Sequence, residues 1–374
     1  MTTTPAPVIE TSPPSAPADA GSGAATLPQW RLMARRFRKN RLAVASAIVL
    51  VVLYACAILA PFLSPNSYDQ QDADLKNASP TSITWSGGPA ICSRQQQLDT
   101  ETFSYKYRSD CGQSVPLRFF GEGYHYKLFG LIPTNRHLVT VDKPNTLLLW
   151  GADSAGRDVF ARSMQGARVS LTIGLLGVAV GTFLGATVGT ISGYFRGAVD
   201  TVLQRFIELL TSLPTLPLWL ALAAILPQDM SVTGRYFLIT LILSLVGWAG
   251  LARQIRGKVM SYAASDYVAA ARIAGSSSAR IVFRHLIPNA SSHIVATAML
   301  AVPATIISET SLSFLGVGML PPAVSWGVLL SDAQSVSTVQ QYPWLLIPAA
   351  LVVIAVICFQ LIGDGLRDAV DPYG

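Results

Sequence analysis

The chain has 374 residues, of which 51% are hydrophobic and only 13% are charged. Soluble domains carry about 25% charged residues, so this composition indicates a membrane protein. The net charge of +6 would by itself permit nucleic-acid binding. The basic residues cluster at the ends of apolar runs, however, and this distribution argues against a nucleic-acid partner.

The N-terminal part of the chain predicts a tail and then a membrane span. Residues 1–28 are rich in Pro, Ala, Ser and Thr, which is typical of a disordered segment. Residues 29–63 combine an amphipathic basic segment with a charge-free apolar run, 42–63. This run has the roughly 20 residues that a span needs. A signal peptide is the alternative, but its apolar region would be about 7–15 residues long.

Five further apolar runs predict five more spans. In the second of the six spans, glycines recur at intervals of four residues, which predicts close approach to another helix. Six spans place both termini on one side, so the expected fold class is an all-α polytopic membrane protein with six transmembrane helices. The five runs are residues 169–195, 209–228 (interrupted by Pro214 and Pro217), 236–252, 291–317 and 342–363.

The distribution of Lys and Arg predicts the orientation of these spans, because cytoplasmic loops hold the excess of basic residues. The segment before the first span and the loop at 253–290 are both rich in Arg and Lys. The loop at 227–235 and the region 318–341 are poor in them. The six-span topology puts all the basic segments on one side, which is therefore predicted to be cytoplasmic.

The segment at 64–150 lies on the opposite side in this topology and is expected to form a small extracytoplasmic insert. It contains two cysteines, Cys92 and Cys111. In an oxidising compartment we expect a disulfide between them. This bond would close a loop of roughly 20 residues and contribute about 3 kcal/mol on a chain-entropy estimate. The alternative is two unpaired surface thiols.

The sequence contains no catalytic constellation, and no cofactor or metal site is expected. The pair Gly257-Lys258 lacks the upstream glycine of a P-loop, so we do not expect the chain to bind ATP by itself. Two acids lie near the membrane, Glu208 and Glu309. They would serve an ion-coupled secondary transporter as a relay, or they would hydrogen-bond to neighbouring spans as structural groups. Two acids without an intramembrane base favour the second interpretation.

Residues 266–290 (DYVAAARIAGSSSARIVFRHLIPNA) are polar and basic, although they lie between two apolar runs. Ser265 is expected to cap a helix at 267–274, which Gly275 ends in a left-handed conformation. The serines at 276–278 then cap a second short helix, and Pro288 is expected to break the chain after it. We call this segment the elbow. It predicts a docking element for another protein; a solvated loop lying on anionic lipid is the alternative.

The elbow resembles the cytoplasmic "EAA" loop of binding-protein-dependent ABC importer permeases. That pattern is Glu-Ala-Ala, three residues, Gly, a spacer and Ile-x-Leu-Pro. The alanine pair at 270–271, Gly275 and Pro288 match it, whereas Ala269 replaces the usual Glu and Ile287 the usual Leu. The resemblance covers about residues 30–65 and 150–374. Segments typical of the dipeptide/oligopeptide (peptide/nickel) type are residues 151–158, 166–171, 311–318, 321–322, 326–327 and 363–372.

The resemblance implies a non-catalytic permease subunit of the bacterial cytoplasmic (inner) membrane, with its permease domain at 151–374 and its coupling loop at 253–290. The implied partners are a second homologous permease, two ABC ATPase subunits and an extracytoplasmic substrate-binding protein. Dipeptides, longer peptides, nickel chelates, glutathione and opine-like compounds are substrates of such systems. The residues implied to contact an ATPase are Asp266, Tyr267, Ala270, Ala271, Arg272, Gly275, Arg284, Pro288 and Asn289.

Overall fold

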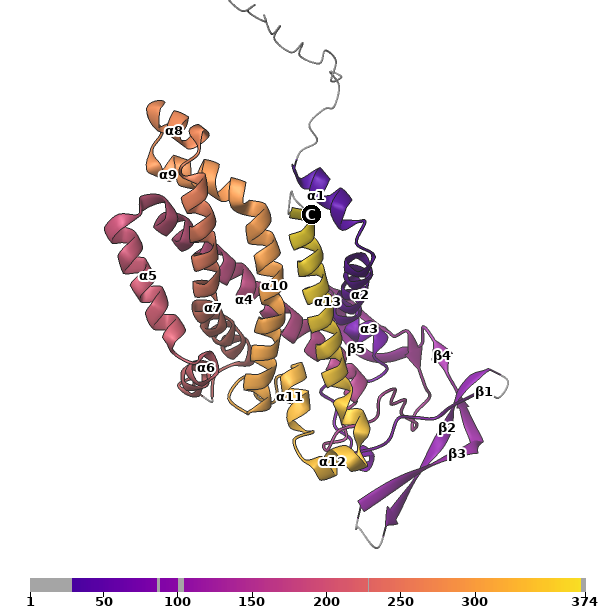
Figure 1. The fold of residues 1–374 in the computed structure, drawn as a ribbon. Coiled ribbons are helices and arrows are strands. Elements are labelled where there is room, and N and C mark those ends of the chain that lie inside the picture. Colours follow the sequence, from indigo (N-terminus) through magenta and orange to yellow (C-terminus); the bar gives the residue numbers. More distant parts are fainter. Residues whose placement is uncertain (1–28, 86–87, 100–103, 228, 371–374) are drawn as a thin grey trace, which may run out of the picture.

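The structure is a computed structural model that describes residues 29–370, apart from 86–87, 100–103 and 228 (Figure 1). Five of the described helices are long and apolar enough to cross a membrane, and one bent pair of helices would make a sixth crossing. The chain is therefore a multi-pass helical membrane protein, as its composition predicts. The tail expected at 1–28 lies outside the described residues.

The basic segment and the first apolar run form three consecutive helices. These are α1 (Gln29–Phe37), α2 (Arg41–Ile58) and the short α3 (Ala60–Leu63). Asn40 begins α2, because its side chain accepts a hydrogen bond from the Ala43 N–H (3.1 Å). The single run expected at 42–63 is thus interrupted at Leu59, and Pro61 occupies the first turn of α3, where a proline is tolerated.

The span expected at 209–228 is not one straight helix. It is divided between α5 (Gly197–Ser212) and α6 (Thr215–Ala224), which meet at 83°. Pro214 explains the break, since it has no N–H and disfavours a helical conformation in the residue before it. That residue, Leu213, is extended (ψ 134°). The run is therefore broken at Pro214, as expected, whereas Pro217 lies in the first turn of α6 and does not interrupt it.

Four long helices form the rest of the bundle. They are α4 (Val159–Phe195), α7 (Val232–Tyr262), α10 (Ile287–Phe314) and α13 (Ile347–Val370). Each extends beyond its predicted apolar run on at least one side. In Figure 1, α1 and the C-terminal end of α13 lie at the same end of the bundle as the elbow, and we call this the elbow end. The opposite end holds α6 and the short helices α11 (Trp326–Ser331) and α12 (Val336–Gln341), and a 3-10 turn, η3 (Pro343–Leu346), precedes α13.

The glycines of α4 pack directly against the backbone of α7, which confirms the predicted close approach. A Cβ atom placed on Gly185 would lie 2.9 Å from the Trp248 carbonyl oxygen, and one on Gly189 would lie 2.4 Å from the Ala252 carbonyl oxygen. The four-residue spacing on α4 therefore matches a four-residue spacing on α7, as expected for two helices in backbone contact.

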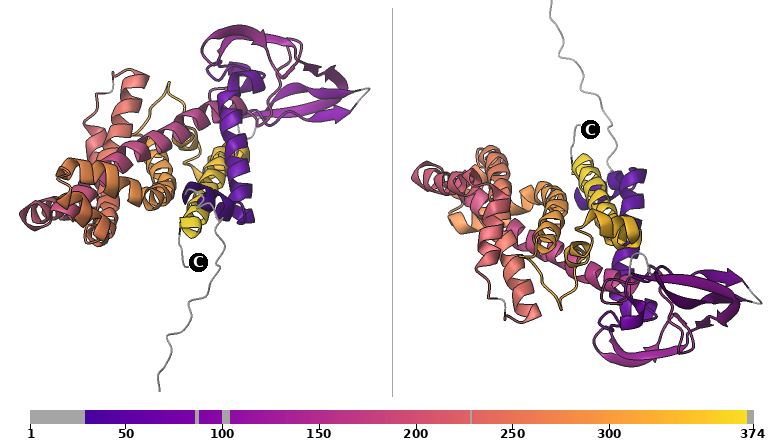
Figure 2. Two further views of the ribbon diagram at one scale, coloured as in Figure 1. Left: turned by 90° about the horizontal axis from the view of Figure 1, so that it is seen from above. Right: turned by 90° about the horizontal axis from the view of Figure 1, so that it is seen from below.

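The insert between α3 and α4 is built mainly from strands and lies to one side of the helices, next to α3 (Figure 2). A 3-10 turn, η1 (Ala73–Leu75), precedes its strands. One three-stranded antiparallel sheet has the order β1 (Ile83–Trp85), β2 (Pro89–Asp99) and β3 (Ser104–Pro116). Two smaller pairs follow: β4 (Arg118–Phe119) with β7 (Val139–Thr140), and β5 (Glu122–Leu128) with β6 (Ile132–Arg136).

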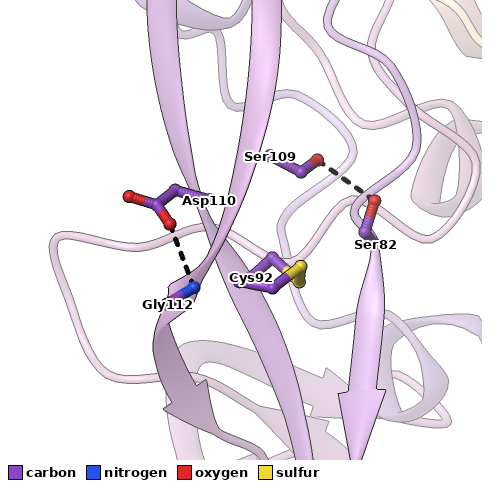
Figure 3. The surroundings of a disulfide bond; sticks show 6 residues. Ser82, Cys92, Ser109, Asp110 and Gly112 are labelled. Atoms are coloured by element: carbon purple, nitrogen blue, oxygen red, sulfur yellow. Dashed lines mark hydrogen bonds between the residues drawn. A yellow bond between two sulfur atoms is a disulfide. The ribbon is translucent and has the colours of Figure 1, made fainter.

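A disulfide joins Cys92 of β2 to Cys111 of β3 (Figure 3). It lies at an irregularity in the sheet, where Cys92 pairs with Ser114 but the next residue, Ser93, pairs with Asp110. The residues between these partners bulge out of β3. The disulfide therefore fastens the two strands at the point where their ladder of hydrogen bonds is interrupted.

Candidate functional site: the elbow between two long helices

The elbow contains two short helices joined by a glycine turn. α8 (Asp266–Ile273) follows α7, and α9 (Ser278–Ile281) precedes α10. Gly275 has φ of +75°, and its N–H donates to the Arg272 carbonyl oxygen while the Ser276 N–H donates to that of Ala271. This is a Schellman turn, which needs a left-handed residue. Gly275 thus ends the first helix as predicted.

The serines behave in two different ways. Ser277 caps α9, because its hydroxyl oxygen accepts a hydrogen bond from the Arg280 N–H (3.3 Å). Ser265 occupies the cap position of α8, but its hydroxyl donates to the Tyr262 carbonyl oxygen and makes no cap bond. The predicted side-chain cap at Ser265 is therefore wrong, since the hydroxyl is engaged by the end of α7.

Pro288 does not break the chain as expected. A π-helical turn, η2 (Val282–Leu286), follows α9, and Pro288 lies in the first turn of α10 directly after it. Proline has no N–H to donate to the carbonyl oxygen four residues earlier. The wider hydrogen-bond spacing of the preceding π turn accommodates this missing bond. Residues 278–314 consequently form one continuous helical segment, so the second arm of the elbow is an extension of a membrane-spanning helix.

The inner side of the elbow packs on the ends of three long helices. Val268 of α8, Ile281 of α9 and Leu286 of η2 are completely buried. They belong to one hydrophobic cluster with residues of α4, α7 and α10, which include Ala186, Ile255, Val259 and Ile294. A cluster of this kind resists relative movement of its members. The elbow and the helix ends beneath it are therefore expected to move as one body.

Two polar contacts reinforce this packing. The guanidinium of Arg272 lies over the ring of Tyr194 in α4, 5.0 Å from its centroid. The Asn289 side-chain amide donates to the hydroxyl of Tyr267 (3.0 Å), which joins α10 to α8. Three of the predicted docking residues, Tyr267, Arg272 and Asn289, thus hold the elbow together.

The outer face of α8 is exposed and small-residued, with one large apolar side chain. Asp266, Ala269, Ala270 and Ile273 share this face, opposite the buried Val268. Ile273 is 88% exposed, so its side chain points away from the buried cluster beneath α8. Ala269, which replaces the Glu of the resembling pattern, lies on the same face. Of the other predicted residues, Gly275, Arg284 and Pro288 are exposed and Ala271 is half-buried.

Sequence reasoning did not single out Ile273 or Phe283, which is 56% exposed. The available signal was the helical spacing: Ile273 is three residues from Ala270 and four from Ala269, so it shares their face. Which face points outward depends on the burial of Val268, and the sequence alone does not show this.

A cavity of about 560 Å³ lies between α4, α7 and α10, towards the elbow end. Small and hydroxylated residues line most of it, including Gly181, Ser244 and Thr297. His293 of α10 and Arg367 of α13 also contribute to its wall, and no acidic residue is among those that line it. The cavity is therefore lined mainly by small and apolar groups, slightly basic at His293 and Arg367, and bordered by the helices that carry the elbow.

Glu309 is completely buried in α10, close to the other end of the bundle. It accepts hydrogen bonds from the hydroxyls of Ser170 in α4 (2.9 Å) and Ser313 (2.8 Å). The Ser170 hydroxyl in turn accepts a hydrogen bond from the Trp326 N–H, and the Ser313 hydroxyl accepts one from the Met319 N–H. In the described part of the chain no basic side chain pairs with Glu309. Glu208 is exposed and pairs with Arg205 (2.7 Å). The structural interpretation of Glu309, a carboxylate bonded to a neighbouring span, is confirmed.

The segment at 151–158 folds into a compact turn that starts α4. Asp153 accepts the N–H groups of Ala155 and Arg157 and forms an ion pair with the Arg157 side chain (2.8 Å). Asp158 caps α4 by accepting the Phe160 N–H (2.8 Å). Burial raises the pKa of Asp158 to about 6, although hydrogen bonds from Asn66 and the helix N–H groups favour its charged form.

Comparison with known proteins identifies the family. Residues 168–373 match the model of the "Binding-protein-dependent transport system inner membrane component", and residues 28–80 match that of the "N-terminal TM domain of oligopeptide transport permease C". The first match covers the elbow, the cavity and Glu309. It also covers more than half of the chain.

Curated relatives resemble nearly the whole chain. The oligopeptide transport system permease protein OppC of Haemophilus influenzae is 32% identical over 92% of this chain and 88% of its own length. OppC of Escherichia coli K12 is 33% identical over 92% and 91%. The dipeptide transport system permease protein DppC of Bacillus subtilis is 29% identical over 90% and 84%. The chain therefore belongs to the family of binding-protein-dependent transport system inner membrane components, the permeases of oligopeptide and dipeptide transport among them.

Proposed function

We propose that this chain is one of two permease subunits of an ATP-driven importer for di- or oligopeptides in a bacterial cytoplasmic membrane. A second, homologous permease would complete the pore, two ATPase subunits would dock at the elbow end, and an extracytoplasmic binding protein would deliver the peptide. The relatives are named as oligopeptide and dipeptide transport permeases, and this supports the substrate class.

The proposed topology places the elbow end in the cytoplasm. The Arg and Lys residues of the segment before α2 and of the elbow support this orientation. The disulfide of Cys92 and Cys111 belongs to the insert on the other side, where an oxidising compartment favours its formation. The insert would then face the binding protein.

The observation that carries the proposal is the division of the elbow into a packed and an exposed side. The exposed face with Ala269, Ala270 and Ile273 would lie in a groove of an ATPase subunit. The buried side, with Val268 and Leu286, joins that face to α4, α7 and α10. When two ATPases close on ATP, a rigid elbow would pass their movement to these helices, which is a rigid-body mode of switching.

The cavity between α4, α7 and α10 would form this subunit's part of the peptide path. Its volume of about 560 Å³ lies within the usual range of small-ligand sites, roughly 300–1,000 Å³. Hydroxyl groups such as those of Thr182 and Thr297, which line the cavity, suit a peptide backbone without selecting one side chain. This arrangement supports a path of low selectivity, with selection left to the binding protein.

Uptake by proteoliposomes that contain the complete transporter tests the proposal. Peptide accumulation is expected to require ATP on the ATPase side and to persist when proton and sodium gradients are collapsed. Uptake that survives inactivation of the ATPases but stops with the ion gradient would contradict it. Such a result would favour an ion-coupled carrier instead, for which the comparisons give no support.

A variant connects this function to the elbow. Gly275→Pro removes the N–H that bonds to Arg272 and forbids the φ of +75°. Its membrane insertion is expected to stay normal while ATP-dependent uptake is lost. Normal uptake by this variant would show that the elbow does not transmit the movement.

A further inference from the structure

The segment that precedes the first span presents a basic surface that the proposed transport mechanism does not use. Arg31, Arg35 and Arg38 follow one another at spacings of four and three residues, so they lie on one side of α1 and its last turn. All three are exposed, as is Lys39. Residues 29–41 contain no acidic residue. In the described part of the chain none of these three arginines forms an ion pair.

The position of α1 is fixed at the membrane end of two spans. Phe37 packs on Gly365 in the last turns of α13, with 3.4 Å between its ring and a Cβ atom placed on the glycine. Only residues 38–40 separate α1 from α2, and Asn40 caps α2. Figure 1 shows α1 beside the C-terminal end of α13. The basic side of α1 is therefore held at the level where α2 enters the bilayer.

The neighbouring face of α2 is exposed and apolar. Ile48 and Val52 are 60% and 55% exposed, and they lie seven and eleven residues after Arg41, on the same side of the helix. Such a face on a membrane span contacts lipid chains. Arg41 is exposed at the beginning of this face. The cations at 38, 39 and 41 thus lie where the headgroups of those lipids must be.

We propose that Arg31, Arg35, Arg38, Lys39 and Arg41 form a binding surface for the phosphate groups of anionic phospholipids in the leaflet at the elbow end. A guanidinium group donates two parallel hydrogen bonds to a phosphate. In a zwitterionic headgroup the lipid's own cation neutralises the phosphate, so its attraction to the arginines is weaker. Basic segments next to a span are attracted to anionic lipids in this way. Lipid binding at this surface is independent of which substrate the chain transports. Only the assignment of the surface to the cytoplasmic leaflet rests on the proposed topology.

Lipid titration of the purified full-length chain, followed by native mass spectrometry, tests the proposal. The wild type is expected to bind phosphatidylglycerol in preference to phosphatidylcholine. The triple variant Arg31→Gln, Arg35→Gln, Arg38→Gln is expected to lose on the order of tenfold in apparent affinity for phosphatidylglycerol. A control with the same loss of charge, Arg253→Gln, Lys258→Gln, Arg280→Gln, is expected to retain the preference.

Two further experiments distinguish a lipid headgroup from free phosphate, and a lipid from a protein partner. Inorganic phosphate in excess is expected not to displace the lipid; displacement would show a simple anion site and overturn the proposal. Equal lipid binding by the triple variant and the wild type would also overturn it, and loss of ATPase co-purification in the same variant would then identify the surface as a protein interface.

The wild type alone keeps the test decisive if the triple variant fails to fold. Its preference for phosphatidylglycerol is expected to fall as potassium chloride screens the surface. A preference that is insensitive to salt would show that the arginines determine topology only.

Discussion

Arg256 and Asp200 form a bidentate ion pair between α7 and α5, with both N–O distances at 2.6 Å. The pair lies directly before the elbow, because α7 continues to Tyr262 and α8 begins at Asp266. Asp200 also accepts a hydrogen bond from Ser192 of α4. Three helices are therefore fastened together at the point where movement of the elbow would enter the bundle.

Loss of this pair is expected to weaken both stability and transmission. Arg256→Gln leaves Asp200 partly buried without its charged partner, which costs about 2 kcal/mol for hydrogen bonds of this kind. Thermal unfolding of the purified protein is expected to occur at a lower temperature, and ATP hydrolysis in the complex is expected to drive less uptake. Arg253→Gln is the control, since Arg253 is exposed and, among the described residues, its side chain donates one hydrogen bond, to Thr211. Similar unfolding temperatures for the two variants would contradict this role.

Glu309 is expected to stabilise the segment that returns to the bundle after α10. In Glu309→Gln one oxygen remains to accept two hydroxyl donors, Ser170 and Ser313, which already accept the N–H groups of Trp326 and Met319. One hydroxyl therefore loses its acceptor, at a cost of about 1–2 kcal/mol. Calorimetry of this variant is expected to show the loss, whereas Glu208→Gln, which removes an exposed ion pair, is expected to change stability by about 0.5 kcal/mol or less. Equal effects would argue against the network.

Asp158 predicts a pH dependence of stability. Its pKa in the folded protein is about 6, above the ordinary value of 3.8, because it is buried. The folded state therefore binds this proton more tightly than the unfolded state. The resulting stabilisation is complete below pH ~4 and is lost as the pH rises through ~6.

Asp158→Asn is expected to remove this contribution and so to flatten the stability curve between pH 4 and pH 7, by roughly 3 kcal/mol over the window. The asparagine keeps the cap of α4. The new amide loses stability where its NH2 group faces the NH2 group of Asn66, but this loss is the same at every pH. The slope of stability against pH is therefore the informative quantity. Unfolding temperatures measured across the window check it; an unchanged slope would show that Asp158 titrates normally.

The disulfide in the insert is expected to stabilise the sheet locally. Its cysteines are separated by 19 residues. Closure of such a loop contributes about 3 kcal/mol on a chain-entropy estimate. Cys92→Ser with Cys111→Ser is expected to make the β2–β3 region sensitive to protease, while the helices and peptide uptake remain. Cys56→Ser is the control. Unchanged protease resistance would show that strand pairing alone holds the hairpin.

The helical part of the fold could be predicted from the sequence because apolar length determines a membrane span. The beginning of α4 could not, since Arg162 and Arg168 suggest the end of a span, yet Arg162 is buried beside Asp153. The strands of the insert showed no clear alternation of apolar and polar residues. Most of their side chains are only half-buried or exposed, which explains the weak pattern.

The elbow was predictable in its glycine and its position, but not in its orientation. Gly275 determines a local turn, and a turn that depends on one residue type can be predicted from the sequence. The effect of Pro288 depends on the π turn before it, and the outward direction of Ile273 depends on the packing of Val268. These are tertiary effects, so the sequence could locate the proposed docking segment without showing which side of it is exposed.

Association of the ATPase subunits with elbow variants shows whether the exposed face of α8 is their docking surface. Ile273→Asp places a charge on the exposed face of α8 without disturbing the core beneath it, and Ile132→Asp makes the same change on the exposed part of the insert. We expect the ATPases to fail to co-purify with Ile273→Asp and to remain bound to Ile132→Asp. Full co-purification with Ile273→Asp, together with normal ATP-dependent uptake, would contradict this expectation.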